Sequence, residues 1–342
     1  MTDLGLFYPA GHEAHRMRDH LERPERVEAI HQALLDSGVW NRSHLIQPDE
    51  IPLTVMETTH TPQYLSLLER ACRRGGYLDA DTYVTPASWE LAHLSAGGAV
   101  AIARWVWQRA GQTGLALCRP PGHHAMRGQG MGFCLLNNIA LAAEALIQVE
   151  GAQRVAIIDL DLHHGNGTQD IFWERGDVFY ISTHQRPLYP GTGSLEERGY
   201  RAGEAATANF PLPPGSGDEA FAAVLAQAIL PLLERFEPEM LLVSYGFDTH
   251  WRDPLGSLLL TVDGYARLVQ RLNEFALKHC QGRIALILEG GYDLEAGAAC
   301  TLAVLNALFG QTWQDPLGPS PYRQTTAWQE MLDRALDIWD IK

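Results

Sequence analysis

Short runs of apolar residues alternate along the chain with longer segments that have the apolar periodicity of helices. The runs expected to form strands are Leu4–Tyr8, Thr113–Cys118, Arg154–Asp159, Val178–Ser182, Met240–Ser244 and Ile284–Leu288. The segments expected to form helices are Arg26–Ser37, Pro62–Arg73, Ser88–Arg109, Asn138–Val149, Gly167–Trp173, Asp218–Phe236, Val262–His279 and Leu294–Phe309. Because single helices separate successive strands, the pattern predicts a mainly parallel sheet with helices on both faces.

Three long loops rich in glycine and proline each follow a strand directly. They are Arg119–Gly132, His184–Gly203 and Phe247–Ser257. In an open parallel sheet, ligands bind beyond the carboxyl ends of the strands, so we expect these loops to share one rim. The chain has no visible repeat or linker and is expected to form a single domain over residues 1–342. Its core spans about residues 7–309, and the tail 310–342 packs either on this domain or on a partner such as a second copy.

The composition excludes some classes of partner. The chain has 342 residues, of which 41 are acidic and 26 basic, and a net charge of −15 does not suit binding to a nucleic-acid backbone. Five widely spaced cysteines lie in apolar stretches without any Cys-x-x-Cys pair, which indicates reduced, buried thiols and no thiolate zinc site. Without a signal peptide or a bilayer-spanning run, we expect a cytoplasmic protein that has no membrane partner.

The segment Asp159–Thr168 places two aspartates and two histidines directly after an apolar strand. Side chains alternate along a strand, so Asp159, Asp161 and His163 are expected to point the same way. A buried carboxylate is unfavourable unless it is paired or coordinates a metal. A surface loop that happens to be rich in Asp and His is the alternative, and the apolar flanks argue against it. The pattern therefore predicts a metal site at this strand end.

Four other segments place chemically capable side chains on the same expected rim. His123 and His124 are candidate acid/base groups or ligands, although adjacent histidines are often a surface accident. Asp248 follows another strand and either completes a metal site or serves as a turn residue. The glycines of Gly290–Tyr292 let the backbone bend sharply and leave the tyrosine projecting over the rim, and Gly132–Cys134 is suited to the wall of a narrow pocket.

Together, these segments resemble the histone deacetylase family of the arginase–deacetylase superfamily, including bacterial-type histone deacetylase-like amidohydrolases. The resemblance extends from about Phe7 to about Phe309 and implies a three-layer fold with a mainly parallel sheet of about eight strands. Asn166 resembles the class II branch, because class I members have Asp at this place. The motifs that carry the resemblance are His20–Arg26, Pro120–Ala125, Gly132–Cys134, Asp159–Thr168, Pro190–Gly193, Gly246–Asp248 and Glu289–Tyr292.

The resemblance implies that Asp161, His163 and Asp248 bind one Zn²⁺ ion. Three protein ligands leave one coordination position open for water and substrate, as in catalytic zinc sites. Two oxygen ligands and one nitrogen ligand would also accept Fe²⁺ or Co²⁺. Arginase-like relatives bind two Mn²⁺ ions with more ligands, whereas these motifs supply one set.

One or two K⁺ ions are also implied by the resemblance. The first would be bound by main-chain oxygens of Asp159, Asp161, His163 and Thr183 and by the Ser182 hydroxyl. The second would be bound by the carbonyls of Phe172, Arg175 and Val178.

The tandem histidines match the catalytic pair of the family, in which Asp159 partners His123 and Asn166 partners His124. A carboxylate neighbour stabilises the imidazolium and raises its pKa, and a neutral amide does so much less. We therefore expect His124 to be the general base and His123 the positively charged partner. Tyr292 matches the tyrosine that donates a hydrogen bond to the developing oxyanion.

Five residues match the substrate-contacting positions of the family: Gly132, Phe133, Tyr189, Leu255 and Gly291. Phe133 and Tyr189 would line the acyl-lysine tunnel, where the family usually has Phe at the second place. Polyamine-selective relatives have Glu at the place of Leu255, so leucine favours acyl-lysine substrates.

The expected activity is zinc-dependent removal of acetyl or other short acyl groups from acyl-lysine side chains. An acetylpolyamine or small-molecule deacylase or esterase is the main alternative. An arginase-type hydrolase and a non-catalytic acyl-lysine binding module are the others. Asp79 and Asp81 are suited to binding substrate backbone at the rim or to helix capping.

Overall fold

Eight parallel strands form the central sheet of the computed structural model, which describes residues 3–341. The strands are β1 (Leu4–Phe7), β2 (His44–Leu45), β5 (Thr113–Ala116), β6 (Val155–Asp159), β7 (Val178–Gln185), β8 (Thr207–Leu212), β9 (Met240–Tyr245) and β10 (Ile284–Leu288). Their order across the sheet is β2-β1-β5-β10-β9-β6-β7-β8, and each neighbouring pair is parallel. A separate antiparallel pair consists of β3 (Gly76–Tyr77) and β4 (Tyr83–Val84).

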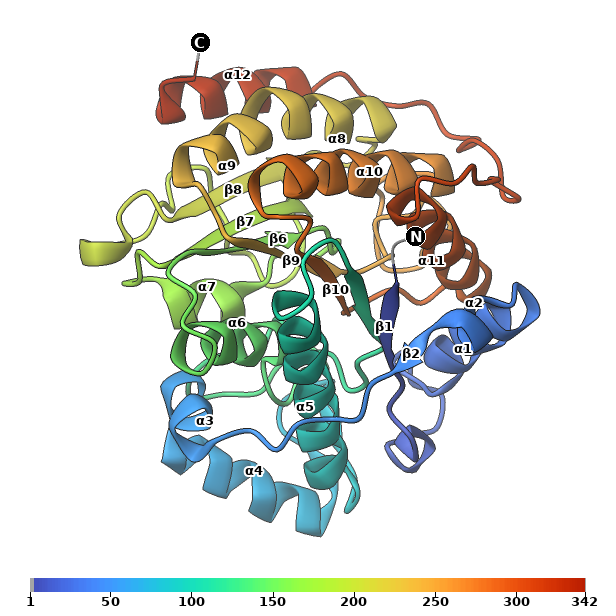
Figure 1. Ribbon diagram of the computed structural model, residues 1–342, viewed down its shortest axis with the longest axis vertical. Helices are drawn as coiled ribbons and strands as arrows, with labels where there is room; N and C mark the ends of the chain where they lie inside the picture. The colour runs from blue at the N-terminus through green and yellow to red at the C-terminus, as the bar shows by residue number, and fades with distance from the viewer. Residues whose placement is uncertain (1–2, 342) are drawn as a thin grey trace.

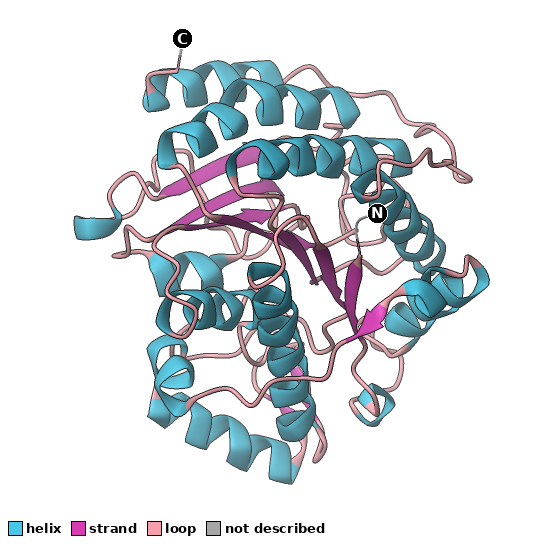
Figure 2. Ribbon diagram, in the orientation of Figure 1, coloured by secondary structure: helices cyan, strands magenta, loops and turns pink. Residues whose placement is uncertain are grey.

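Helices cover both faces of this sheet, so the domain has three layers (Figures 1 and 2). One face is covered by α1 (Glu25–Asp36), α8 (Asp218–Val224), α9 (Leu230–Phe236), α10 (Val262–His279), α11 (Leu294–Leu308) and α12 (Trp328–Trp339). The other face is covered by α5 (Ser88–Trp107), α6 (Asn138–Gln148) and α7 (Asn166–Phe172), with α3 (Leu53–Thr59) and α4 (Pro62–Arg74) packed outside them. Short elements are α2 (Val39–Arg42), two 3-10 turns (His12–Ala14 and Arg201–Gly203) and a π-helical turn between α8 and α9 (Leu225–Ile229).

The continuous apolar runs of the strands follow from this double covering. In β6, Ala156 and Ile158 belong to the core on one side of the sheet, whereas Val155 and Ile157 belong to the core on the other side. All four side chains are fully buried. A strand with both faces buried has no solvent side for polar residues, so its sequence does not alternate.

The expected parallel α/β architecture is confirmed. The sequence pattern did not indicate several elements, namely β2, β3, β4, β8, α2, α3 and α12. Strand β8 contains Pro211, which lacks a backbone N–H and reads as a loop residue, but β8 lies at an edge of the sheet, where proline is tolerated. Helix α12 in the C-terminal tail packs on the domain itself. Its Trp339 is 4% exposed and lies 6.2 Å from Phe179 of β7 between ring centroids.

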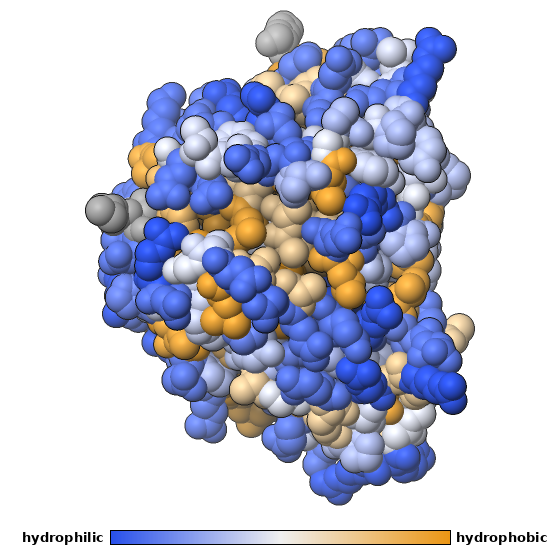
Figure 3. Space-filling model, turned by 90° about the vertical axis from the view of Figure 1, so that its right-hand side faces the viewer, coloured by the Kyte–Doolittle hydropathy of each residue, from blue (hydrophilic) through white to orange (hydrophobic). Residues whose placement is uncertain are grey.

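The face of the molecule that Figure 3 shows is mostly hydrophilic. The face that Figure 3 shows has hydrophobic residues gathered near its middle, with hydrophilic residues around them. Within residues 3–341, no helix combines the length and apolarity that crossing a bilayer requires. All five cysteines are buried as free thiols, as their apolar surroundings in the sequence suggested.

Candidate active site

A cavity of about 250 Å³ opens at the carboxyl ends of the central strands. Residues from all three glycine- and proline-rich loops contribute to it, so these loops share one rim as expected. The residues that line it are Asp81, Pro121, His123, His124, Gly132, Phe133, Cys134, Asp161, His163, Leu188, Tyr189, Leu255, Gly290 and Tyr292.

Asp161, His163 and Asp248 come together at the inner end of this cavity, with one potential ligand atom from each within 4.8 Å of the others. His163 Nδ1 lies 3.2 Å from Asp161 Oδ1 and 3.2 Å from Asp248 Oδ2. Tetrahedral ligands at the usual zinc distances lie roughly 3.3 Å apart, so the spacing fits a metal ion. Asp248 Oδ2 is buried and accepts no hydrogen bond from any residue in 3–341, which also fits an atom that serves as a metal ligand.

Gly290 shows why this site requires a residue without a side chain. Its backbone N–H donates to Asp161 Oδ2 over 2.8 Å and holds that carboxylate in place. A Cβ atom at this position would lie 2.6 Å from Asp161 Oδ2 and closer still to Asp248 Oδ2. Only glycine therefore lets this backbone approach the two carboxylates.

Asp159 does not join this cluster, and the expectation that three alternating side chains would point the same way was wrong. Strand β6 ends at Asp159, and the chain from Leu160 to His163 is irregular, so strand alternation does not extend to His163. The carboxylate of Asp159 instead accepts hydrogen bonds from Tyr180 and from the backbone N–H of Asp161. Only Asp161 and His163 contribute to the cluster from this segment.

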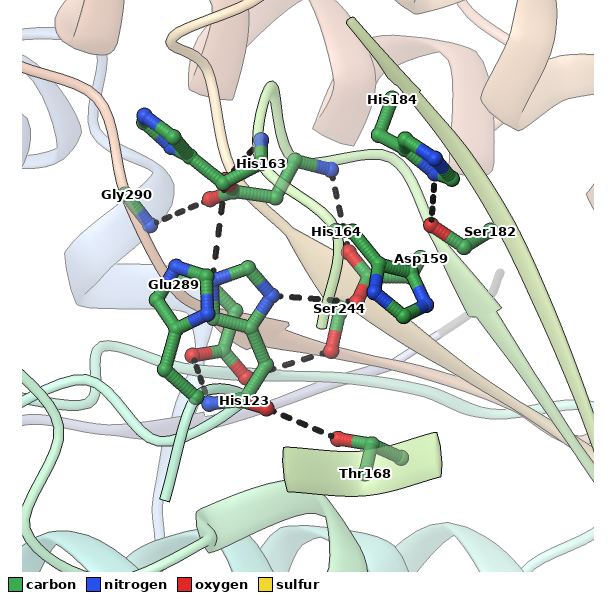
Figure 4. Close-up of polar contacts among 12 residues, drawn as sticks. His123, Asp159, His163, His164, Thr168, Ser182, His184, Ser244, Glu289 and Gly290 are labelled. Atoms are coloured by element: carbon green, nitrogen blue, oxygen red, sulfur yellow. Dashed lines mark hydrogen bonds and ion pairs between the residues drawn. The ribbon is translucent and has the colours of Figure 1, made fainter. Parts of the chain in front are cut away.

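His123 lies between the carboxylates of Asp159 and Asp161, the first of which Figure 4 labels. Its Nδ1 atom is 3.1 Å from Asp159 Oδ2, and its Nε2 atom is 3.7 Å from Asp161 Oδ1. Burial alone lowers the pKa of His123, but the charges of Asp161 and Asp159 outweigh that effect and raise it to about 10. The two carboxylates therefore favour the protonated form of His123.

His124 has a different environment, although the two rings are only 4.0 Å apart between centroids. Burial and the positive charges of His123 and His163 hold the pKa of His124 well below its usual value. Its Nδ1 atom lies 2.7 Å from Asn166 Oδ1. Since the amide oxygen only accepts, Nδ1 carries the proton and Nε2 is left with a free lone pair.

Glu289 and Arg26 hold the loops of the site in place through hydrogen bonds to the backbone. Both residues lie in the sequence motifs named above, but no role was predicted for either. Glu289 Oε2 accepts the backbone N–H groups of Gly122 (2.7 Å) and His123 (3.0 Å), which fixes the loop that carries the tandem histidines (Figure 4). The guanidinium of Arg26 is fully buried and donates to the carbonyls of Glu289 and Gly291. Arg26 shares the buried face of α1 with Ile30 and Leu34, and a basic residue at helical spacing from apolar ones was the signal that could have indicated this role.

Tyr292 also borders the cavity. Its ring packs edge-on against Phe133 at 5.9 Å between centroids, and the Arg26 guanidinium lies 4.8 Å from its ring centre. The preceding Gly291 has φ +111°, a conformation that side chains rarely adopt. A Cβ there would also overlap the ring of Phe247, so this bend depends on glycine.

Phe133, Tyr189 and Leu255 border the outer part of the cavity together with Gly132. Tyr189 is 40% exposed, so it stands at the mouth rather than deep inside. Its ring is edge-on to His124 at 5.2 Å between centroids. The walls near the mouth are thus aromatic and aliphatic, and the polar groups lie at the inner end.

Asp79 and Asp81 lie on the loop between β3 and β4. Asp79 Oδ1 accepts the backbone N–H groups of Asp81 (3.2 Å) and Thr82 (2.7 Å), so this carboxylate stabilises the turn. Asp81 is exposed and borders the cavity, and its carbonyl lies 3.0 Å from His20 Nε2. Of the two, only Asp81 lines the cavity.

The residues expected at the first K⁺ site lie on β6, on β7 and on the segment that follows β6. The Thr183 hydroxyl donates to the Asp159 carbonyl over 3.3 Å, and Ser182 Oγ lies 2.9 Å from His184 Nδ1. At the second expected site, the Phe172 carbonyl accepts the N–H of Arg175 over 3.0 Å. Carbonyl and hydroxyl oxygens are the ligands that hard cations prefer, so the donor type at both places fits K⁺.

Comparison with known proteins supports the resemblance to histone deacetylases that the sequence motifs indicated. Residues 20–308 match the histone deacetylase domain. The chain is 40% identical over 331 residues to a probable deacetylase of Archaeoglobus fulgidus, with 94% of this chain and 92% of that protein covered. It is 37% identical over 302 residues to a histone deacetylase-like amidohydrolase of Pseudomonas aeruginosa, with 87% and 80% covered.

A solved structure also matches along nearly the whole chain. The crystal structure of the HDA15 HD domain superposes with a TM-score of 0.89 at 34% sequence identity, covering 99% of this chain and 95% of that chain. The three-layer arginase–deacetylase fold implied by the motifs is thereby confirmed. The chain belongs to the histone deacetylase family, whose members include deacetylases and amidohydrolases.

Proposed function

We propose that this protein is a zinc-dependent amidohydrolase that removes acetyl or other short acyl groups from acyl-lysine side chains. The observation that carries the proposal is the cluster of Asp161, His163 and Asp248 at the inner end of a narrow, largely apolar-walled cavity. When bound there, a divalent ion supplies polarisation of the acyl carbonyl and lowers the pKa of water. The cavity walls accommodate the aliphatic part of an extended side chain.

The histidines divide the proton transfer between them. His124 has a free Nε2 lone pair and a lowered pKa, so it accepts a proton from the attacking water. His123 remains positively charged between Asp159 and Asp161 and stabilises negative charge as it develops. Tyr292 donates its hydroxyl proton in a hydrogen bond to the carbonyl oxygen as that oxygen becomes an anion.

A single metal ion suits the donor groups better than a pair. A second trio with close potential ligand atoms near the cavity consists of His123, Cys134 and Glu289. Burial, followed by the nearby charge of Glu289, raises the pKa of the Cys134 thiol well above its usual value, which leaves it neutral and a poor ligand. Glu289 already accepts two backbone N–H groups. This arrangement disfavours an arginase-type two-metal reaction.

Leu255 at the cavity wall bears on the substrate class. A carboxylate at the place of Leu255 would compensate the charge of a polyamine's second amine, and leucine provides none. Outside the inner end, the carboxylate that lines the cavity is Asp81. An acyl-lysine substrate has only the one nitrogen that becomes an amine, which lies at the inner end. We therefore expect acyl-lysine peptides to be better substrates than acetylpolyamines.

The test is an activity panel with metal analysis on the same preparation. Acetyl-lysine peptide, acetylspermidine and a short ester are compared, and the prediction is highest kcat/KM for the peptide with one zinc per chain. Higher turnover of acetylspermidine would assign the protein to polyamine deacylation. Two manganese ions per chain would support guanidino hydrolysis, and peptide binding without hydrolysis would indicate a binding module.

Tyr292→Phe tests the chemistry separately from the substrate class. Removing one oxyanion donor costs about 3–4 kcal/mol, or roughly 10²–10³ in kcat. Binding of a metal-directed hydroxamate inhibitor should persist, because the variant retains all three ligands. Unchanged turnover would contradict the assigned role of Tyr292.

A further inference from the structure

One buried carboxylate that is not among the candidate metal ligands accepts hydrogen bonds from two parts of the cavity wall. Asp253 is 6% exposed and lies on the loop after β9, five residues beyond Asp248. Its Oδ1 atom accepts the backbone N–H of Leu255 over 3.0 Å. Its Oδ2 atom accepts the backbone N–H of Tyr292 over 2.7 Å.

The second of these hydrogen bonds acts on the peptide unit that carries Tyr292. The carbonyl of Gly291 and the N–H of Tyr292 belong to one planar peptide group. Arg26 Nε donates to that carbonyl, and Asp253 Oδ2 accepts from that N–H. The peptide plane is therefore held at both ends by buried polar side chains.

This orientation matters because Gly291 offers little resistance to rotation of the peptide. Glycine populates positive and negative φ almost equally, and here φ is +111°. Without an acceptor for its N–H, the peptide unit could rotate, and the Tyr292 side chain would move with it. A second contact joins the loop that carries Asp253 to the segment after Tyr292. The guanidinium of Arg252 pairs with Asp293 (3.2 Å) and Glu295 (2.7 Å).

We propose that Asp253 is a positioning residue for this reaction, because its carboxylate orients the Gly291–Tyr292 peptide and thereby aims the Tyr292 hydroxyl. The inference rests on the proposed function, in which Tyr292 is the oxyanion donor. The same carboxylate fixes Leu255 in the cavity wall through its other oxygen. Two acceptor oxygens are needed for the two N–H groups, and a carboxylate has both, whereas an amide has one.

The experiment measures kcat and KM for an acetyl-lysine peptide with Asp253→Asn and Asp253→Ala. A displacement of about 1 Å in a reacting group lowers rates by roughly 10²-fold. We expect kcat to fall at least about tenfold in Asp253→Asn and further in Asp253→Ala, with KM changed by less than about threefold. Zinc content should remain at one per chain, since no ligand is altered.

A double-mutant cycle with Tyr292→Phe separates positioning from a general structural effect. If Asp253 acts through the Tyr292 hydroxyl, adding Asp253→Asn to Tyr292→Phe should lower kcat by less than about twofold more. If the two losses multiply instead, Asp253 does not act through Tyr292 and the inference is overturned. Tyr292→Phe measured alone tests the proposed function, so failure of that assignment is recognised independently of the coupling.

Asp218→Asn serves as a matched control. Asp218 is also largely buried and accepts the backbone N–H and the hydroxyl of Thr261, but it lies away from the cavity. It should lower thermal stability without lowering kcat. If Asp253→Ala does not fold, Asp253→Asn and its double-mutant cycle with Tyr292→Phe still test the proposal. A folded Asp253→Asn variant with wild-type kcat would refute the positioning role of Asp253.

Discussion

Replacing Asn166 with aspartate adds a negative charge beside His124 with almost no change in side-chain size. In the native protein, Asn166 Oδ1 accepts the Nδ1 proton of His124 over 2.7 Å, and the pKa of His124 is held well below its usual value. An aspartate at this place would accept the same hydrogen bond. It would also favour the protonated imidazolium electrostatically.

The expected magnitude follows from the geometry. Two unit charges about 4 Å apart interact by about 4 kcal/mol at an effective dielectric constant of about 20. One pKa unit corresponds to about 1.36 kcal/mol, so the pKa of His124 should rise by up to roughly 3 units. Desolvation of the new carboxylate opposes part of this, and we expect a rise of at least about 1 unit.

The assay is the pH dependence of kcat/KM with an acetyl-lysine peptide. A general base must be neutral, so activity falls as the pH drops through its pKa, and a raised pKa moves this acidic limb to higher pH. Zinc content and thermal midpoint of the variant serve as controls. If the acidic limb stays in place while zinc and folding are unchanged, His124 is not the base that limits the rate.

Four further outcomes follow from the same structure. Chelation should abolish turnover, and one equivalent of Zn²⁺ should restore it. Gly290→Ala should weaken zinc binding by roughly 10–100-fold, measured by competition with a chromogenic chelator, because its Cβ would crowd the carboxylates of Asp161 and Asp248. Leu255→Glu should raise kcat/KM for acetylspermidine relative to the acetyl-lysine peptide, since a carboxylate at the cavity wall attracts a second amine. Trp339→Ala should lower the free energy of unfolding by about 3–5 kcal/mol in urea titrations while kcat stays unchanged.

The grouping of Asp161, His163 and Asp248 was predictable from the sequence because these residues follow buried strands. Asp161 and Asp248 come shortly after β6 and β9, which pair directly in the sheet, so their side chains meet at one edge. Strand alternation alone grouped Asp159 with Asp161 and His163, and it failed because this strand ends at Asp159 itself. The family motifs, in contrast, placed Asp159 beside His123, where it lies.

Supporting residues were harder to find because they act through the backbone. Asp253 and Glu289 accept N–H groups from loops that are distant in sequence, and neither residue has a characteristic spacing to its partners. A carboxylate followed by proline also reads as a turn. Such roles depend on tertiary contacts that residue patterns do not encode.

In the fold, the buried strands and the long helices were predicted closely, since continuous apolar runs and helical periodicity are strong signals. Strand β10 and helix α10 have the predicted bounds. Strand β8 was missed because Pro211 and the short apolar stretch resemble a loop, and helix α12 because it lies in the tail.

Helix α12 also protects an edge of the sheet from pairing with strands of other chains. Strand β8 is the last in the sheet and presents unpaired backbone groups, which is where foreign chains add to a protein by strand pairing. Helix α12 packs against β8, and Pro211 removes one donor from that strand. A truncation that ends near residue 310 would therefore expose an aggregation-prone margin, even though every residue of the catalytic cavity would be retained.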